Sequence, residues 1–83
     1  MPTKADLRDW LLLALRAHDG KASIVQICKH IWEHHEEELR RSGDLFFTWQ
    51  YDVRWAATRL RNEGMLRARG SSARGLWELE DSR

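Results

Sequence analysis

Three glycines divide the 83-residue chain into segments with different hydrophobic spacing, and this division constrains the fold more than any other feature. Gly20 and Gly64 each follow a segment whose apolar residues recur at helical spacing, and Gly43 lies in a Ser-Gly-Asp turn cluster. After Gly64 the pattern changes to two short apolar runs. The sequence therefore predicts three helices followed by two short strands.

The first two helices carry capping signals at their N-termini. Thr3 is followed by Asp6, and Ser23 is followed by Gln26, which are the spacings of a side chain that caps a helix and an acceptor in its first turn. Gly20 ends the first helix, and a short extended link at 21–23 leads to the second. These helices are expected at about residues 4–18 and 24–40.

The third helix is expected at about residues 49–63, with Thr48 as its N-cap and Gly64 at its C-terminal end. On a helical wheel, one side is apolar and is expected to face the core. That side consists of Trp49, Val53, Ala56, Ala57 and Leu60. The opposite side consists of Thr48, Tyr51, Arg54, Trp55, Thr58 and Asn62, with Gln50 and Arg61 on its flank.

Two strand-like runs, at 65–68 and 76–79, flank the loop RGSSARG at 69–75. The pair predicts a β-hairpin over about residues 65–79. Three helices followed by such a hairpin are typical of a winged helix-turn-helix domain, in which the third helix enters the major groove and the loop reaches the neighbouring backbone or minor groove. The expected fold is thus mainly α (α+β), a single winged-helix domain over residues 1–83.

The basic residues are concentrated in one segment. Residues 54–75 contain six arginines and one acid, Glu63, so this segment has a formal charge of +5 in a chain whose net charge is +1. Such a distribution favours an oriented surface for a polyanion, and arginine suits bidentate contacts to phosphate or guanine. We therefore expect double-stranded DNA as the partner.

The chain also resembles a known family. The segments LRDWLLLALRAHDGKASIVQICKHIW, VRWAATRLRNEGML and RGLWELE are similar to the winged-helix domain at the N-terminus of Mrr-type restriction endonucleases and to related small prokaryotic proteins. The resemblance covers about residues 7–80 and implies DNA binding through the third helix and the wing. It does not imply nuclease activity, because the catalytic domain of those enzymes is a separate unit.

The candidate DNA contacts fall into two groups. Contacts that give sequence preference are expected from Gln50, Tyr51, Arg54 and Thr58. Contacts to phosphates are expected from Arg61, Arg67, Arg69, Ser71, Ser72 and Arg74. Arg59 lies toward Asp52 on the wheel, so an ion pair and a DNA contact both stay open, and for Trp55 we favour packing against the hairpin or a neighbouring subunit over stacking on a base.

Other chemistry is less supported by the sequence. His30 and His34 are four residues apart on one helix face, but a third ligand for a metal is missing, so neither a metal nor a cofactor is expected. The acidic residues nearby favour a solvated helix end, and His18 is expected as a cation at a helix end. Cys28 lies among apolar residues and is interpreted as a small buried hydrophobe that fits a reducing compartment.

The sequence contains no nucleophile triad and no phosphate-binding glycine loop, and a core this small leaves little room for a substrate cleft, so no enzymatic activity and no small-molecule substrate are expected. The longest apolar run, WLLLAL, is too short to cross a bilayer. We expect a cytoplasmic, nucleoid-associated DNA-binding protein that acts as a regulator or an architectural factor. A homodimer is compatible with this expectation. The alternative is a protein-interaction module or a DNA-recognition accessory subunit of a restriction or phage-defence system.

Overall fold

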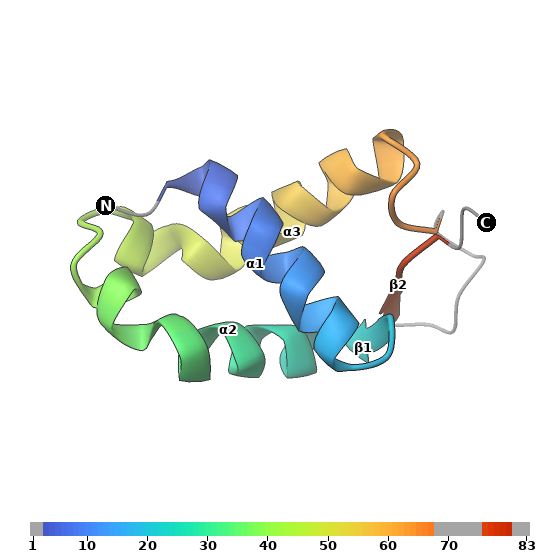
Figure 1. The fold of residues 1–83 in the computed structure, drawn as a ribbon. Coiled ribbons are helices and arrows are strands. Elements are labelled where there is room, and N and C mark those ends of the chain that lie inside the picture. Colours follow the sequence, from blue (N-terminus) through green and yellow to red (C-terminus); the bar gives the residue numbers. More distant parts are fainter. Residues whose placement is uncertain (1–2, 68–75, 81–83) are drawn as a thin grey trace.

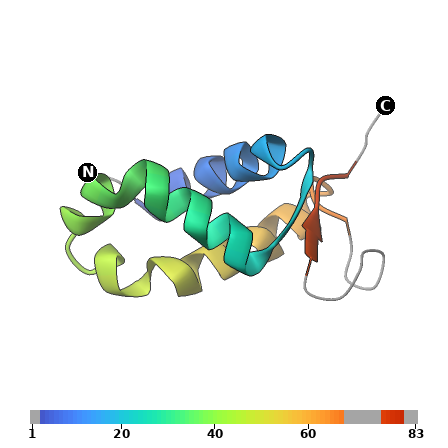
Figure 2. The same cartoon turned by 90° about the horizontal axis from the view of Figure 1, so that it is seen from below.

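The computed structural model describes residues 3–67 and 76–80, and within these ranges the chain forms three helices and a small antiparallel sheet. The helices are α1 (Lys4–Ala17), α2 (Ile24–Arg40) and α3 (Leu45–Asn62), and the strands are β1 (Lys21–Ser23) and β2 (Leu76–Glu78). Figures 1 and 2 show the helices packed as a bundle, with the strands at one end and the turn between α2 and α3 at the other. The expected mainly helical α+β class is confirmed.

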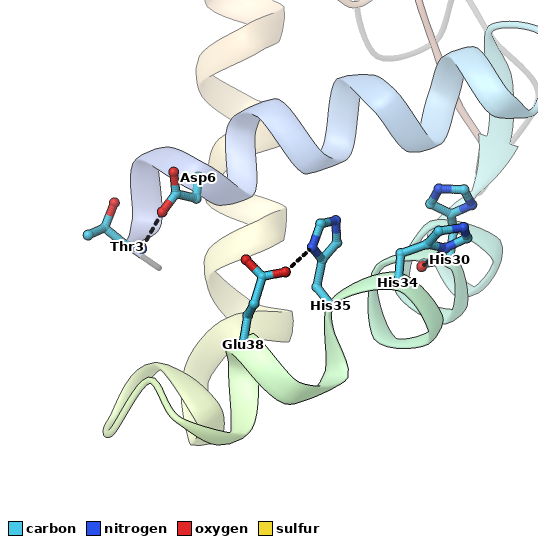
Figure 3. Close-up of polar contacts among 6 residues, drawn as sticks. All are labelled: Thr3, Asp6, His30, His34, His35 and Glu38. Atoms are coloured by element: carbon cyan, nitrogen blue, oxygen red, sulfur yellow. Dashed lines mark hydrogen bonds and ion pairs between the residues drawn. The ribbon is translucent and has the colours of Figure 1, made fainter. Parts of the chain in front are cut away.

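The two predicted capping boxes are both present. The backbone N–H of Thr3 donates to Oδ2 of Asp6 at 2.8 Å (Figure 3). Ser23 Oγ accepts from the N–H of Gln26 at 3.1 Å, and Gln26 Oε1 accepts from the N–H of Ser23 at 2.8 Å. Each box satisfies backbone donors that a helix N-terminus leaves without partners.

The predicted start of the third helix is wrong. The helix begins at Leu45 and not after Thr48, whose hydroxyl donates to Oδ2 of Asp52 at 2.8 Å inside the helix. Leu45 and Trp49 are both buried, so the apolar stripe of α3 extends one turn further back than the capping signal suggested. Gly64, with a φ of 82°, ends the helix as expected, because this left-handed conformation suits glycine.

The core lies between the three helices and reaches the sheet. All five residues predicted for the core side of α3 are buried, and the same is true of the apolar stripe of α1. Trp32, Phe46, Trp77 and Leu79 are partly buried against this core. The buried hydrophobic residues are Leu7, Trp10, Leu11, Leu12, Ala14, Leu15, Ala22, Ile27, Ile31, Leu39, Leu45, Trp49, Val53, Ala56, Ala57, Leu60 and Leu66.

Helix α2 is kinked at His35, whose φ of −133° and ψ of 21° are not helical. His35 occupies a position on the apolar face of α2, and its ring stacks on Trp10 of α1 with centroids 3.8 Å apart. Its Nδ1 lies 2.8 Å from Oε1 of Glu38 (Figure 3). The kink therefore lets a polar ring pack flat on a core tryptophan while its nitrogen keeps a polar partner.

The sheet differs from the predicted hairpin. Strand β2 pairs antiparallel with β1, with Ala22 opposite Trp77, so the segment expected as a link is a strand. The segment expected as the first hairpin strand forms a single bridge, Leu66 with Leu79. Two backbone hydrogen bonds flank this bridge, from Arg67 N–H to the Glu78 carbonyl and from Glu80 N–H to the Met65 carbonyl. Residues 68–75, which include the expected loop, lie outside the described residues.

Candidate nucleic-acid interface

The face of α3 that points away from the core carries the residues expected to give sequence preference. Gln50, Tyr51 and Arg54 are exposed, and Thr58 and Arg61 are half-buried. They recur at helical spacing along one side, so α3 brings all five together. This is the part of the predicted site that the structure describes as one continuous surface.

Within the described part of the chain, this face of α3 has no carboxylate, because the acids of the region turn toward α1. Asp52 is buried, and its Oδ1 lies 3.7 Å from Nζ of Lys4. Glu63, just beyond the helix, pairs with Arg8, with 2.6 Å between Oε1 and Nη2. The two acids are thus held against cations of α1, away from the outward side that carries the arginines.

Two polar side chains on this face are linked to one another. Arg61 Nη2 donates to Thr58 Oγ1 at 3.3 Å, and the same hydroxyl donates to the carbonyl of Arg54 at 3.2 Å. The back-bonded hydroxyl of Thr58 therefore helps to hold Arg61 along the helix. A phosphate contact by Arg61 would have to compete with this weak bond.

Arg67 lies at the sheet end of the molecule rather than on α3. Its Nη1 is 4.0 Å from Oε2 of Glu78 on β2, and its buried Nε has no hydrogen-bond partner among the described residues. A half-buried guanidinium with an acidic neighbour is a weaker candidate for phosphate binding than the sequence suggested. The other expected wing contacts lie outside the described residues: Arg69, Ser71, Ser72 and Arg74.

Two residues whose roles the sequence left open are now placed. Asp52 bonds to Lys4 and Thr48, so the ion pair considered for Arg59 is not the one that forms. Trp55 is 53% exposed and makes an edge contact with Tyr51, at 6.2 Å between ring centroids. Tyr51 and Trp55 both line a groove between α1 and α3. Trp55 therefore packs beside α1 in the described part of the chain, and not against the hairpin as we favoured from the sequence.

Sequence reasoning missed a second groove, between α2 and α3. It has a volume of about 560 Å³, and Lys29 and Val25 of α2 contribute to it beside Gln50 and Arg54. A wheel of α2 places Val25 and Lys29 on one outward face, since they are one turn apart and away from the buried Ile27, but it does not show that α3 lies beside them. Cys28 also lines the groove and is only half-buried, so its interpretation as a buried hydrophobe is wrong in part.

A row of histidines lies on the other side of α2. The rings of His30 and His34 stack with centroids 4.1 Å apart, and His18, at the end of α1, meets His30 edge-on at 5.9 Å (Figure 3 shows the first pair). Burial lowers the pKa of His30, and the neighbouring His34 and His18 rings lower it further. Among the described residues, no group of three or more histidine, cysteine or acidic side chains is arranged to hold a metal ion.

The acidic end of α2 is partly neutralised by its own basic residues. Glu36 pairs with Arg40 at 2.8 Å, and Glu37 pairs with Arg41 at 3.9 Å, each one turn apart. Arg40 also lies over the ring of Trp32, 5.2 Å from its centroid. The acidic helix end is solvent-exposed, as expected from the sequence, and its acids also form local ion pairs.

The described helices were compared with what a membrane-spanning helix requires. None of the helices within residues 3–67 combines the length and the apolar character needed to span a bilayer.

The resemblance to the winged-helix domain of Mrr-type endonucleases stays a prediction. Comparisons with protein-family models, with curated proteins and with solved structures find no match for this chain.

Proposed function

We propose that this protein binds double-stranded DNA through the exposed face of α3 and has no catalytic activity of its own. The observation that carries the proposal is the charge pattern of that face. Arg54 and Arg61 lie along it with Gln50 and Thr58, whereas the acids Asp52 and Glu63 are paired with cations of α1. A helix face that presents arginines and an amide while its acids turn away complements a polyanion.

The size of α3 also fits this role. The helix has 18 residues, and the major groove of B-DNA, about 12 Å wide, admits one helix with its side chains. Gln50 belongs to its N-terminal half and Arg54 to its middle. Both would meet base edges, because amide and guanidinium groups can make paired hydrogen bonds to adenine and guanine. Thr58 and Arg61 lie further along and would contact the backbone.

The winged-helix form of this proposal is supported by the order of the elements. Three helices are followed by a segment at 65–67 that bonds to β2, and the strands lie beside the C-terminal end of α3 (Figure 1). In a winged-helix domain, the segment that joins two such strands meets the DNA held by the third helix. In this form Arg69, Ser71, Ser72 and Arg74 contact phosphates, and Arg67 contributes less because Glu78 lies beside it. The protein then acts as a regulator or an architectural factor.

The test is fluorescence anisotropy of a labelled random-sequence duplex at two salt concentrations. The variant Arg54→Gln/Arg61→Gln removes two charges from α3, and Arg16→Gln is the matched control, since Arg16 is exposed at the end of α1. We expect salt-sensitive binding by the wild type. The double variant should bind more weakly, and the slope of log K against log salt should fall by about 1 for each phosphate that the variant no longer neutralises.

The same assay separates the two parts of the proposal. Arg69→Ala/Arg74→Ala tests the loop, and loss of affinity in this variant alone would move the contact away from α3. If the wild type fails to bind even at low salt, the DNA proposal is overturned.

A second candidate function is self-association or binding of another protein through aromatic residues. Phe47 is 83% exposed, Tyr51 62% and Trp55 53%, and all three belong to the outward part of α3. Burial of such rings drives association that depends little on salt. Sedimentation of the wild type and of the double variant Phe47→Ser/Trp55→Ser tests self-association. A wild-type dimer and a monomeric variant would support it. A wild-type protein that stays monomeric at high concentration would contradict it.

A further inference from the structure

The groove between α2 and α3, named here the α2–α3 groove, has an aromatic floor. The rings of Trp32 and Trp49 stack with centroids 6.2 Å apart and nearly parallel planes, and Phe46 lies 6.3 Å from Trp32. These three side chains, with Ile24, Val25 and Cys28, form the apolar part of the lining. Trp49 belongs to the core, and Trp32 and Phe46 pack against it, so the floor is held in place by the core. The guanidinium of Arg40 also lies over the Trp32 and Phe46 rings, 5.2 and 5.8 Å from their centroids, so an apolar group would share these rings with it.

The polar part of the lining is cationic. Lys29 comes from α2 and Arg54 from α3, and none of the described residues that line the groove is acidic. Arg54 and Cys28 line the same groove. Burial raises the pKa of the Cys28 thiol, and the charge of Arg54 opposes that rise. Gln50 adds an amide on the same side as Arg54.

The groove between α1 and α3 provides a contrast within the same molecule. Its volume of about 520 Å³ is similar, but its lining includes Asp52 and Glu63 together with Lys4 and Arg8. Those charges already pair with one another. Arg59 also lines this second groove. An anion therefore meets two cations and no carboxylate in the α2–α3 groove, but one further cation beside two carboxylates in its neighbour, so the α2–α3 groove is the more favourable of the two.

We propose that the α2–α3 groove binds a small amphipathic carboxylate, with its apolar part on the Trp32–Trp49 stack and its carboxylate between Lys29 and Arg54. The volume falls within the range of about 300–1,000 Å³ usual for small-molecule sites, which also combine apolar walls with a few polar groups. A guanidinium can bind a carboxylate in a bidentate manner, while the lysine adds a second charge.

The experiment uses a matched set of three probes with one apolar group: 4-phenylbutyrate, 4-phenylbutan-1-ol and 4-phenylbutylamine. Each is titrated into the ¹⁵N-labelled protein without DNA, and amide shifts are followed by NMR. We expect 4-phenylbutyrate to shift residues around Cys28 and Gln50 and to bind more tightly than the alcohol, while the amine does not bind. Arg54→Gln and Lys29→Gln should each weaken binding about fivefold, as for a partly exposed ion pair, and Arg16→Gln should not.

Several results would overturn the proposal. Equal binding of the alcohol and the carboxylate would show an apolar groove without charge selection. Shifts confined to other surfaces, or no shifts at millimolar probe, would place no ligand there. Shifts in the same residues that depend on protein concentration alone would assign the groove to a second copy of the chain.

A consequence for DNA rests on the proposed function, because Arg54 and Gln50 belong to both surfaces. With 4-phenylbutyrate in the groove, Arg54 is engaged, so affinity for DNA should fall in the anisotropy assay. The two ideas fail separately: the NMR titration contains no DNA, so probe binding without DNA binding would refute only the proposed function, and the reverse would refute only the ligand site.

Discussion

Asp52 lies in surroundings that differ from those expected from the sequence. The capping signal at Thr48 predicts it in the first turn of a helix, yet it is a buried carboxylate in the second turn of α3, bonded to Thr48 and Lys4. A helical wheel of α3 could not predict the burial of Asp52, because its partner Lys4 belongs to α1 and because α3 begins before Thr48. A single residue thus links the register of α3 to the position of α1.

We expect Asp52→Ala to lower the free energy of unfolding by about 1–3 kcal/mol, because it removes the hydrogen bond that the Thr48 hydroxyl donates to a charged carboxylate. Lys4→Gln should cost less than about 1 kcal/mol, since the ammonium side of the pair is solvent-exposed. Urea denaturation of the two variants measures both values. A larger loss for Lys4→Gln than for Asp52→Ala would contradict the burial of the carboxylate as the cause.

The lowered pKa of His30 predicts that the stability of the protein depends on pH. Its pKa in the folded chain is lowered from 6.5, so below pH 6.5 the unfolded chain binds more protons than the folded one at this site. Stability should therefore fall as the pH decreases from 6.5 toward the lowered pKa. The change of the free energy of unfolding with pH should be smaller in His30→Gln and unchanged in Lys29→Gln. Urea denaturation between pH 5 and 7.5 measures this change. If His30→Gln and the wild type show the same pH dependence, His30 is not its source.

At the scale of elements, local signals predicted the positions of α1 and α2 well. The capping boxes and the glycines act within a few residues, so the sequence alone contains the needed information. The start of α3 and the pairing of β1 with β2 could not be predicted in this way. Both depend on segments distant in sequence, namely the core that buries Leu45 and the strand that meets Lys21–Ser23.

Ser23 provides an element-scale prediction because it ends β1 and caps α2. Ser23→Ala removes the side-chain bond to Gln26 and should lower the free energy of unfolding by about 1 kcal/mol. Gln26→Glu keeps an acceptor for the Ser23 N–H and is the control, with little expected change. Thermal denaturation followed by circular dichroism compares them, and a neutral Ser23→Ala would show that the strand alone fixes the start of α2.

For the candidate site, the sequence predicted the α3 residues and missed those of α2. Periodicity assigns each residue of α3 to the core or to solvent, and Gln50, Tyr51 and Arg54 are exposed as expected. A wheel cannot show that Lys29 and Arg54 line the same groove, because that depends on the packing of two helices. The α2–α3 groove was therefore outside the reach of single-helix reasoning.

At the scale of the whole molecule, one small core supports every surface described above. Leu11 of α1 is fully buried, and Leu13 on the same helix is 54% exposed. Leu11→Ala should lower the free energy of unfolding by about 2–5 kcal/mol, a large part of the total for a chain of this size, whereas Leu13→Ala should change it by less than about 1 kcal/mol. Thermal melts test this, and similar losses in both variants would contradict the assigned core.

The pairing of β1 with β2 has a consequence for how the chain reaches this fold. The two strands lie on opposite sides of α2 and α3 in the sequence, so their hydrogen bonds close a loop that contains most of the molecule. Closing a long loop costs more chain entropy than forming helices from neighbouring residues. The sheet is therefore expected to assemble after the helices have met, and to be the first part to separate when the molecule opens.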